Sequence, residues 1–193
     1  MSIEIPQPSI ALNSHDVPGT KYDMWETWNV PANNTASDIM LKSMILGICA
    51  DEDMKCLVIN CHGNYGKGTN SSGNPKLIST GGFGLSLGQG INLNNVNEFG
   101  QVRDMFKCII VIACGTAAVT NPGQHGDGGL LCSEIAKAAN AYVIAPKTVQ
   151  LGTKLKLPKN HIDNFEGVVV RYNPAGGLDG SGVLGRKLID EIF

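Results

Sequence analysis

LVINCHG (residues 57–63) and CIIVIACGTA (residues 108–117) are the two most informative runs of this chain. Each is apolar and rich in β-branched residues, which is typical of a strand that is buried on both faces of a parallel sheet. The first run reaches His62, and Cys114 stands in the second, 52 positions later. Groups that follow parallel strands meet in the crevice beyond the carboxyl ends of those strands. We therefore expect His62 and Cys114 to lie together in that crevice.

The segments around these two runs alternate between helical and strand patterns. Such alternation predicts an α/β protein with a mainly parallel sheet covered on both faces. We expect a single domain over residues 1–193. A segment rich in Gly, Ser and Asn, residues 64–82, is predicted to be a loop that moves. The expected helices span 35–50, 93–106, 130–141 and 181–193, and the expected strands span 55–61, 82–90, 107–114, 141–146 and 167–174.

The composition is that of a globular domain. The chain has 193 residues, of which 42% are hydrophobic and 17% charged. A formal net charge of −2 provides no basic surface for phosphates, so we expect no nucleic-acid partner. Neither a long apolar run nor a basic leader is present, so we expect no membrane association and a cytoplasmic location. Export by a route that needs no leader stays open.

The six cysteines do not form a pattern of disulfides or metal ligands. No Cys-x-x-Cys pair occurs, which argues against a zinc ribbon. Cys61 and His62 are adjacent, and adjacent side chains of a strand point to opposite faces, so they are poorly placed to share a metal ion. We expect no metal, no cofactor, and a chain folded in a reducing compartment with most cysteines in its core.

The order of the two motifs resembles that of the caspase-like cysteine peptidases. This family contains caspases, legumains, gingipains, metacaspases, separases and the bacterial CHAT domains. Its members carry an apolar strand followed by His-Gly and then a second apolar strand followed by Ala-Cys, as in His62-Gly63 and Ala113-Cys114. Papain-like and cell-wall amidase-like enzymes have the cysteine first. The resemblance covers about residues 55 to 146. It is closest to CHAT and legumain-like domains, and it implies a three-layer α/β/α sandwich, the caspase-hemoglobinase-like fold.

The resemblance implies a cysteine endopeptidase that works with a His-Cys dyad. Cys114 would attack the peptide carbonyl to form a thioester, and His62 would activate the thiol and protonate the leaving amine. A free thiol is mostly protonated at neutral pH, so it needs such a neighbour. The resemblance assigns the oxyanion donors to the backbone N–H groups of Gly63 and Cys114.

Substrate choice is less well defined by these residues. In the family, the residue two positions before the nucleophile lines the specificity pocket and is acidic in several members. Here it is Ile112, so a preference for basic residues does not carry over. Asp127 is a second candidate pocket residue and His125 a second candidate base, although a plain turn and an exposed loop histidine are more common. We expect a peptide or protein substrate and allow for an activating or inhibitory protein partner. Resemblance to CHAT domains suggests a bacterial effector or defence protease.

Three other functions stay open from the residues alone. The chain can be a non-catalytic caspase-like module that binds a peptide or assembles with partners. It can use GGFGLSLGQG (residues 81–90) as a phosphate loop, although no lysine follows in the phosphate-loop position. It can also attack an amide or ester other than a peptide bond. The reactivity of Cys114 separates the first of these from an enzyme.

Overall fold

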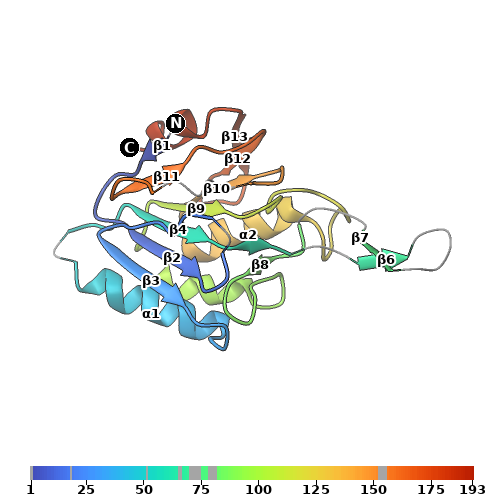
Figure 1. The fold of residues 1–193 in the computed structure, drawn as a ribbon, viewed down its shortest axis with the longest axis horizontal. Helices are drawn as coiled ribbons and strands as arrows, with labels where there is room; N and C mark the ends of the chain where they lie inside the picture. Colours follow the sequence, from blue (N-terminus) through green and yellow to red (C-terminus); the bar gives the residue numbers. More distant parts are fainter. Residues whose placement is uncertain are drawn as a thin grey trace.

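The computed structural model describes residues 2–17, 19–50, 52–64, 67–69, 75–77, 82–151 and 156–193. Its centre is a sheet of seven strands, which Figure 1 shows nearly edge-on. The strands are β2 (Ile10–Ser14), β3 (Glu26–Val30), β4 (Cys56–Asn60), β9 (Cys108–Ile112), β10 (Tyr142–Pro146), β12 (Val169–Tyr172) and β13 (Leu178–Gly182). Their order across the sheet is β13-β12-β10-β9-β4-β2-β3.

The sheet is mixed. Strands β3, β2, β4, β9 and β10 run parallel to one another. Strands β12 and β13 add an antiparallel pair at one edge. The predicted α/β class is confirmed, and the two runs that carry His-Gly and Ala-Cys are neighbouring parallel strands.

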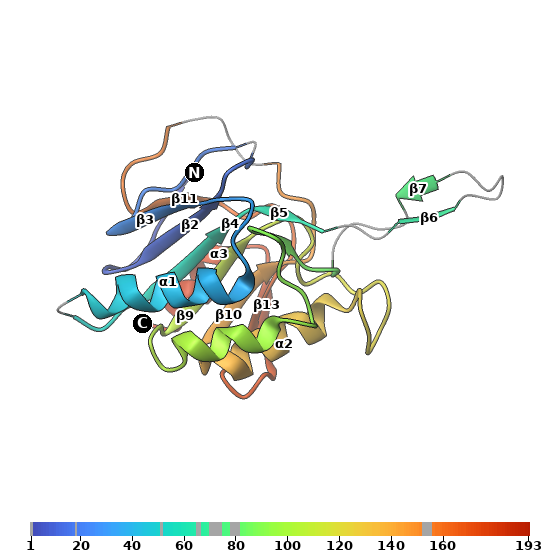
Figure 2. The same cartoon turned by 90° about the horizontal axis from the view of Figure 1, so that it is seen from below.

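The two faces of the sheet are covered differently. One face carries α1 (Ala36–Ile48), the 3-10 helix η1 (Val96–Val102) and α2 (Gly128–Ala139), and Figure 2 shows η1, in green, between α1 and α2 on this face. The other face carries the short helix α3 (Gly185–Asp190) and a two-stranded sheet of β1 (Ser2–Glu4) and β11 (His161–Asp163). Helical cover of the second face is therefore much smaller than expected.

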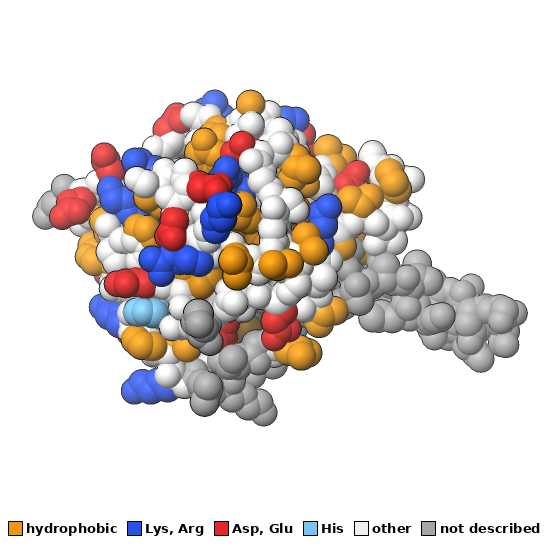
Figure 3. All heavy atoms as spheres, turned by 90° about the horizontal axis from the view of Figure 1, so that it is seen from above, with side chains coloured by type: hydrophobic (Ala, Val, Ile, Leu, Met, Phe, Trp, Pro, Cys, Tyr) orange, Lys and Arg blue, Asp and Glu red, His pale blue; other side chains and the backbone are white. Residues whose placement is uncertain are grey.

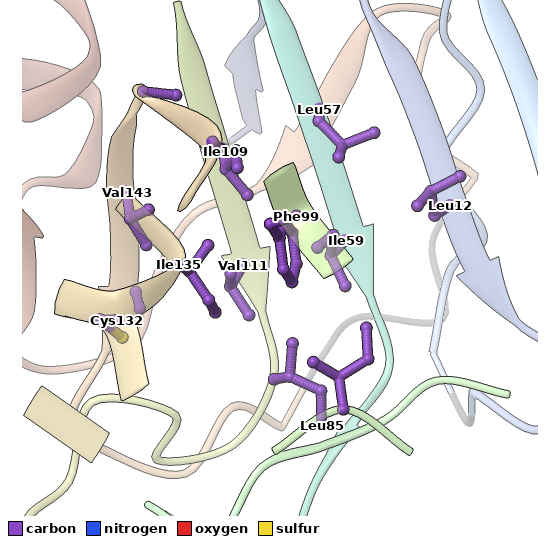
Figure 4. Close-up of a cluster of buried hydrophobic side chains, with 14 of the residues drawn as sticks. Leu12, Leu57, Ile59, Leu85, Phe99, Ile109, Val111, Cys132, Ile135 and Val143 are labelled. Carbon is purple, nitrogen blue, oxygen red and sulfur yellow. The ribbon is translucent and has the colours of Figure 1, made fainter. Parts of the chain in front are cut away.

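Alternate side chains of the central strands pack on opposite faces. Leu57 and Ile59 of β4 lie in the core under the helices, with Phe99 and Ile135, as Figure 4 shows. Val58, between them in sequence, lies in the core of the opposite face. Burying one such side chain stabilises the protein by about 2 kcal/mol. Because both faces are buried, the strand must be apolar at every position, which explains the continuous apolar runs in the sequence.

Helix α1 begins where its sequence predicts. Thr35 is the N-cap: its Oγ1 accepts from the backbone N–H of Asp38 at 3.1 Å, and the Asp38 carboxylate accepts from the Thr35 N–H at 2.9 Å. This reciprocal arrangement satisfies two backbone donors at the helix start. The predicted helix over 35–50 is confirmed.

Several predicted elements differ from the observed ones. Strands β2 and β3 were not predicted, and residues 178–182 form β13 where the final helix was expected to begin. Residues 93–106 contain only the 3-10 helix η1. Within the predicted loop, β6 (Lys67–Thr69) and β7 (Pro75–Leu77) pair as an antiparallel hairpin, set apart from the sheet in Figures 1 and 2. The rest of that loop, and with it the predicted motion, lies outside the described residues.

The surface mixes charges of both signs. Figure 3 shows acidic and basic side chains interspersed over the face that lies above the sheet in Figure 1. This mixing agrees with the near balance of 15 basic and 17 acidic residues. Among the helices that the structure describes, none combines the length and the apolar character needed to cross a membrane.

Candidate active site

The register of β4 and β9 places His62 beside Cys114. Each residue of β4 pairs with the residue 52 positions later in β9, up to the pair Asn60 and Ile112. The backbone N–H of Cys61 extends this ladder by donating to the carbonyl of Ile112 at 3.3 Å. The same offset relates His62 to Cys114. Each of the two residues therefore stands two positions past the last register pair of these neighbouring strands.

His62 and Cys114 line one small cavity at this edge of the sheet. Its volume is about 40 Å³, and both side chains are half-buried. Ile112, the predicted pocket residue, also lines it, together with Gln150 and Asp163. The cavity lies beyond the carboxyl ends of β4 and β9, where the parallel arrangement predicts a functional site.

Gly63 packs directly against the backbone of Cys114. A Cβ atom at position 63 would collide with the Cys114 carbonyl oxygen and lie 3.2 Å from its nitrogen. Only glycine allows this approach. In the antiparallel pairing of β5 (His62–Gly63) with β8 (Leu85–Ser86), the Asn64 N–H donates to Gly84. Since N–H groups along such a strand alternate in direction, the Gly63 N–H points away from β8.

The His62 ring is oriented by Asp16, which the sequence analysis did not identify. Nε2 of His62 lies 3.3 Å from the backbone carbonyl oxygen of Asp16, just after β2. The Asp16 carboxylate accepts a hydrogen bond of 2.5 Å from Ser14 Oγ. This bond is the main cause of a lowered pKa for the Asp16 carboxyl, and nearby His15 and His62 act in the same direction. The Asp16 carboxylate is therefore ionised near His62.

Two buried asparagines hold the segment that carries Asp16. Asn13 of β2 donates to the carbonyl of Tyr22 and accepts from its N–H, both at 2.9 Å. Asn60 of β4 donates to the Asn13 side chain at 2.8 Å and to the carbonyl of Thr20 at 2.9 Å. Buried amides in such a network are costly to remove, because their partners lose hydrogen bonds. The network fixes the loop that follows β2 over the cavity.

The thiol of Cys114 is held by Gln150. Its Sγ accepts from the backbone N–H of Gln150 at 3.3 Å and donates to the carbonyl of the same residue at 3.2 Å. Among the described residues, no hydrogen bond joins Cys114 to His62, and no acceptor receives the backbone N–H of Cys114. Gln150 follows β10, so the strand-end rule predicts the position of its loop but not this residue.

Cys114 differs from the other cysteines in its environment. All six carry free thiols, and four of them are buried, as predicted. Burial is the main cause of a raised pKa for Cys61, Cys108 and Cys132, which reaches about 12 in Cys132. These thiols are inert, because the reactive form of a cysteine is the thiolate. Only Cys49, which is exposed, and Cys114 are accessible.

Asp127 and His125 lie outside the cavity. Asp127 is the N-cap of α2, where it accepts from the N–H groups of Leu130 at 3.0 Å and Gly123 at 2.7 Å. The His125 ring packs edge-to-face on Phe83, with 5.3 Å between ring centroids. Neither residue is among the described residues that line the cavity. The structure does not bring Asp127 into a substrate pocket; it stabilises the start of a helix instead.

The glycine-rich segment that was considered as a phosphate loop has another conformation. A phosphate loop connects a strand directly to a helix whose N-terminus faces the phosphates. Here β8 leads through a tight turn to a β-bridge between Leu85 and Ile91, and η1 begins only at Val96. This geometry does not support the nucleotide-binding alternative.

Comparison with known proteins finds no matching family model, no matching curated protein and no matching solved structure. Within the described parts of the chain, no group of three or more His, Cys, Asp or Glu side chains is arranged to hold a metal ion. What the fold and site define is an α/β protein with a histidine and an accessible cysteine at the carboxyl ends of adjacent strands.

Proposed function

We propose that this chain is a caspase-like cysteine endopeptidase with His62 and Cys114 as its catalytic dyad. The observation that carries the proposal is that His62 and Cys114, each two positions past the last register pair of β4 and β9, line one cavity. The packing of Gly63 on Cys114 is a second support, because it brings the backbone next to His62 into contact with the proposed nucleophile.

The proposed reaction begins with transfer of the thiol proton from Cys114 to His62. Because Nε2 of His62 faces the Asp16 carbonyl and would donate to it, Nδ1 is the nitrogen available to accept that proton. The thiolate attacks the peptide carbonyl and forms a tetrahedral intermediate. His62 then protonates the leaving amine, which gives a thioester, and water hydrolyses this thioester with His62 as base.

Two backbone donors suit the oxyanion of that intermediate. The Gly63 N–H points away from β8, and the Cys114 N–H has no acceptor among the described residues. Donors already in place are worth more than mobile ones, because they cost no reorganisation during the reaction. A side chain at position 63 would displace Cys114 from this arrangement.

Three further features support the proposed substrate class and the proposed cellular compartment. The small cavity and the apolar Ile112 favour a peptide or protein substrate that inserts a small side chain. Free thiols at all six cysteines favour a reducing compartment such as the cytoplasm. A bacterial effector or defence role, and control by a protein partner, follow from the family resemblance alone.

A non-catalytic caspase-like binding module is the alternative. It is favoured by the hydrogen bonds of the Cys114 thiol, both of which go to Gln150 and neither to His62. Such a module would keep the fold and the cavity without transferring a proton between the two side chains.

Labelling with peptide probes separates the two functions. A library of acyloxymethyl-ketone peptides is added briefly and in limiting amount, and modified cysteines are mapped by mass spectrometry. We expect selective labelling of Cys114 in the wild type and in His125→Ala, and its loss in His62→Ala. The exposed Cys49 is an internal control for non-selective alkylation. Equal labelling of Cys114 with and without His62, or no labelling at all, would favour the binding module.

A further inference from the structure

Gln150 contacts Cys114 only through backbone atoms. Its N–H and its carbonyl oxygen both lie within hydrogen-bond distance of the Cys114 sulfur, at 3.3 and 3.2 Å. The loop that contains Gln150 follows β10, the neighbour of β9 in the sheet. It is also tied to the residue after the nucleophile, because the Gly115 N–H donates to the carbonyl of Thr148 at 2.8 Å.

The side chain of Gln150 binds a different part of the chain. Its Nε2 donates to the carbonyl of Glu166 at 2.9 Å, and its Oε1 accepts from the Glu166 N–H at 3.0 Å. The Glu166 carboxylate in turn accepts from the N–H of Leu151 at 3.0 Å. The amide side chain thus makes the two bonds that a neighbouring strand would make with this backbone. The same Nε2 also lies 3.2 Å from the carbonyl oxygens of Thr148 and Val149, so the amide group ties the loop both to Glu166 and to its own backbone.

We propose that the Gln150 side chain is a positioning group that holds the Gln150 N–H against the sulfur of the nucleophile. When Cys114 loses its proton to His62, the bond from sulfur to the Gln150 carbonyl disappears. The bond from the Gln150 N–H remains and strengthens, because its acceptor is now an anion. The N–H is therefore the group of this pair that favours the thiolate, since the carbonyl accepts only from the protonated sulfur. This inference rests on the proposed role of Cys114 as nucleophile.

The test measures thiolate reactivity without a peptide. Iodoacetamide is small and needs no substrate recognition, so its rate of reaction with Cys114, followed by mass spectrometry, reports the thiolate directly. The wild type is compared with Gln150→Ala and Gln150→Glu. The matched control is Gln124→Ala, which removes an exposed glutamine side chain elsewhere. Melting temperature and the ultraviolet absorbance of the thiolate, corrected with Cys114→Ala, are measured on each protein.

We expect Gln150→Ala to slow alkylation of Cys114 roughly tenfold, the lower end of what one hydrogen bond to a charged group contributes. Gln150→Glu keeps the acceptor for the Glu166 N–H and loses the donor, so its rate should fall between the two. The thiolate absorbance should fall in the same order. Gln124→Ala should react like the wild type.

A folded Gln150→Ala protein that is alkylated at the wild-type rate would overturn the inference. If Gln150→Ala lowers the melting temperature strongly, the alkylation rate of Cys114 in Gln150→Glu is compared with the wild type instead, and equal rates would overturn the inference. Failure of the peptidase proposal gives a different result. Cys114 would then not react with the peptide ketones, while its rate of reaction with iodoacetamide would still depend on Gln150.

Discussion

Both ends of the β4–β9 pair carry a cysteine of the second apolar run, and the two thiols have different environments. At the amino end, Cys56 and Cys108 are register partners, both fully buried. Burial, and then the contact with Cys56, raises the pKa of Cys108 well above its ordinary value. At the carboxyl end, two positions past the last register pair, His62 and Cys114 are half-buried and line one cavity. We therefore expect the position along the strand, rather than the residue type, to decide whether a thiol is reactive.

Replacing the two cysteines of β9 separates the roles of the two ends. Cys114→Ala should abolish peptide cleavage, by at least about 10³-fold, with little change in stability. Cys108→Ala leaves a small cavity in the core, so it should cost about 1 kcal/mol of unfolding free energy and keep most activity. Urea unfolding and cleavage of a fluorogenic peptide measure both. Loss of activity in folded Cys108→Ala that equals the loss in Cys114→Ala would break the comparison.

Gly63→Ala tests whether close packing defines the carboxyl end. The new methyl group would collide with the Cys114 carbonyl, so the Cys114 backbone has to move. We expect a loss of about 1–3 kcal/mol in stability and of about 10²-fold in cleavage, because small displacements of a catalytic group are costly. Gly100→Ala is the control, since a Cβ at that position meets nothing within 4 Å. Wild-type activity in Gly63→Ala would remove Gly63 from the proposed oxyanion site.

Unfolding measured at alkaline pH tests whether burial raises the pKa of a core thiol. Burial raises the pKa of Cys132 from 9.0 to about 12, so between these values the folded state keeps a proton that the unfolded state has lost. Stability therefore falls as pH rises through this window, by up to about 1.4 kcal/mol per pH unit for this one group. The Cys132→Ala variant should show a shallower fall when unfolding free energies are compared across the window. Parallel curves for the two proteins would mean that Cys132 is not protected by burial.

The sequence predicts the candidate site residues at the carboxyl end of this sheet better than it predicts the residues that hold them in place. The apolar runs with their His-Gly and Ala-Cys motifs predict the two central strands and the meeting of His62 and Cys114 beyond their ends, whereas the register of these strands comes from the structure. Asp16 was missed because it contacts His62 through its backbone carbonyl, and Gln150 because it contacts Cys114 through its backbone N–H and carbonyl. Almost every residue type provides these backbone groups, so the residue type gives no signal. Strand β2 was missed because it includes two polar residues, Asn13 and Ser14, which are buried. The partners of Asn13 are Tyr22 and Asn60, which lie 9 and 47 positions away, so a local pattern does not reveal why this amide is buried.

Cys49 adds a third thiol to the comparison of Cys108 with Cys114, and substituting it should have the smallest effect on activity and stability. It is exposed at the end of α1, so it has the solvent access that Cys108 lacks. It lines a different cavity, with Trp25 and Glu52 and without a histidine among the described lining residues. If access alone made a nucleophile, Cys49 would react with iodoacetamide faster than the half-buried Cys114. We expect the reverse, because Cys114 shares its cavity with the His62 imidazole and its sulfur accepts a hydrogen bond from the Gln150 N–H. Cys49→Ser should change neither peptide cleavage nor the melting temperature, and a loss of cleavage there would place part of the active site outside the β4–β9 edge.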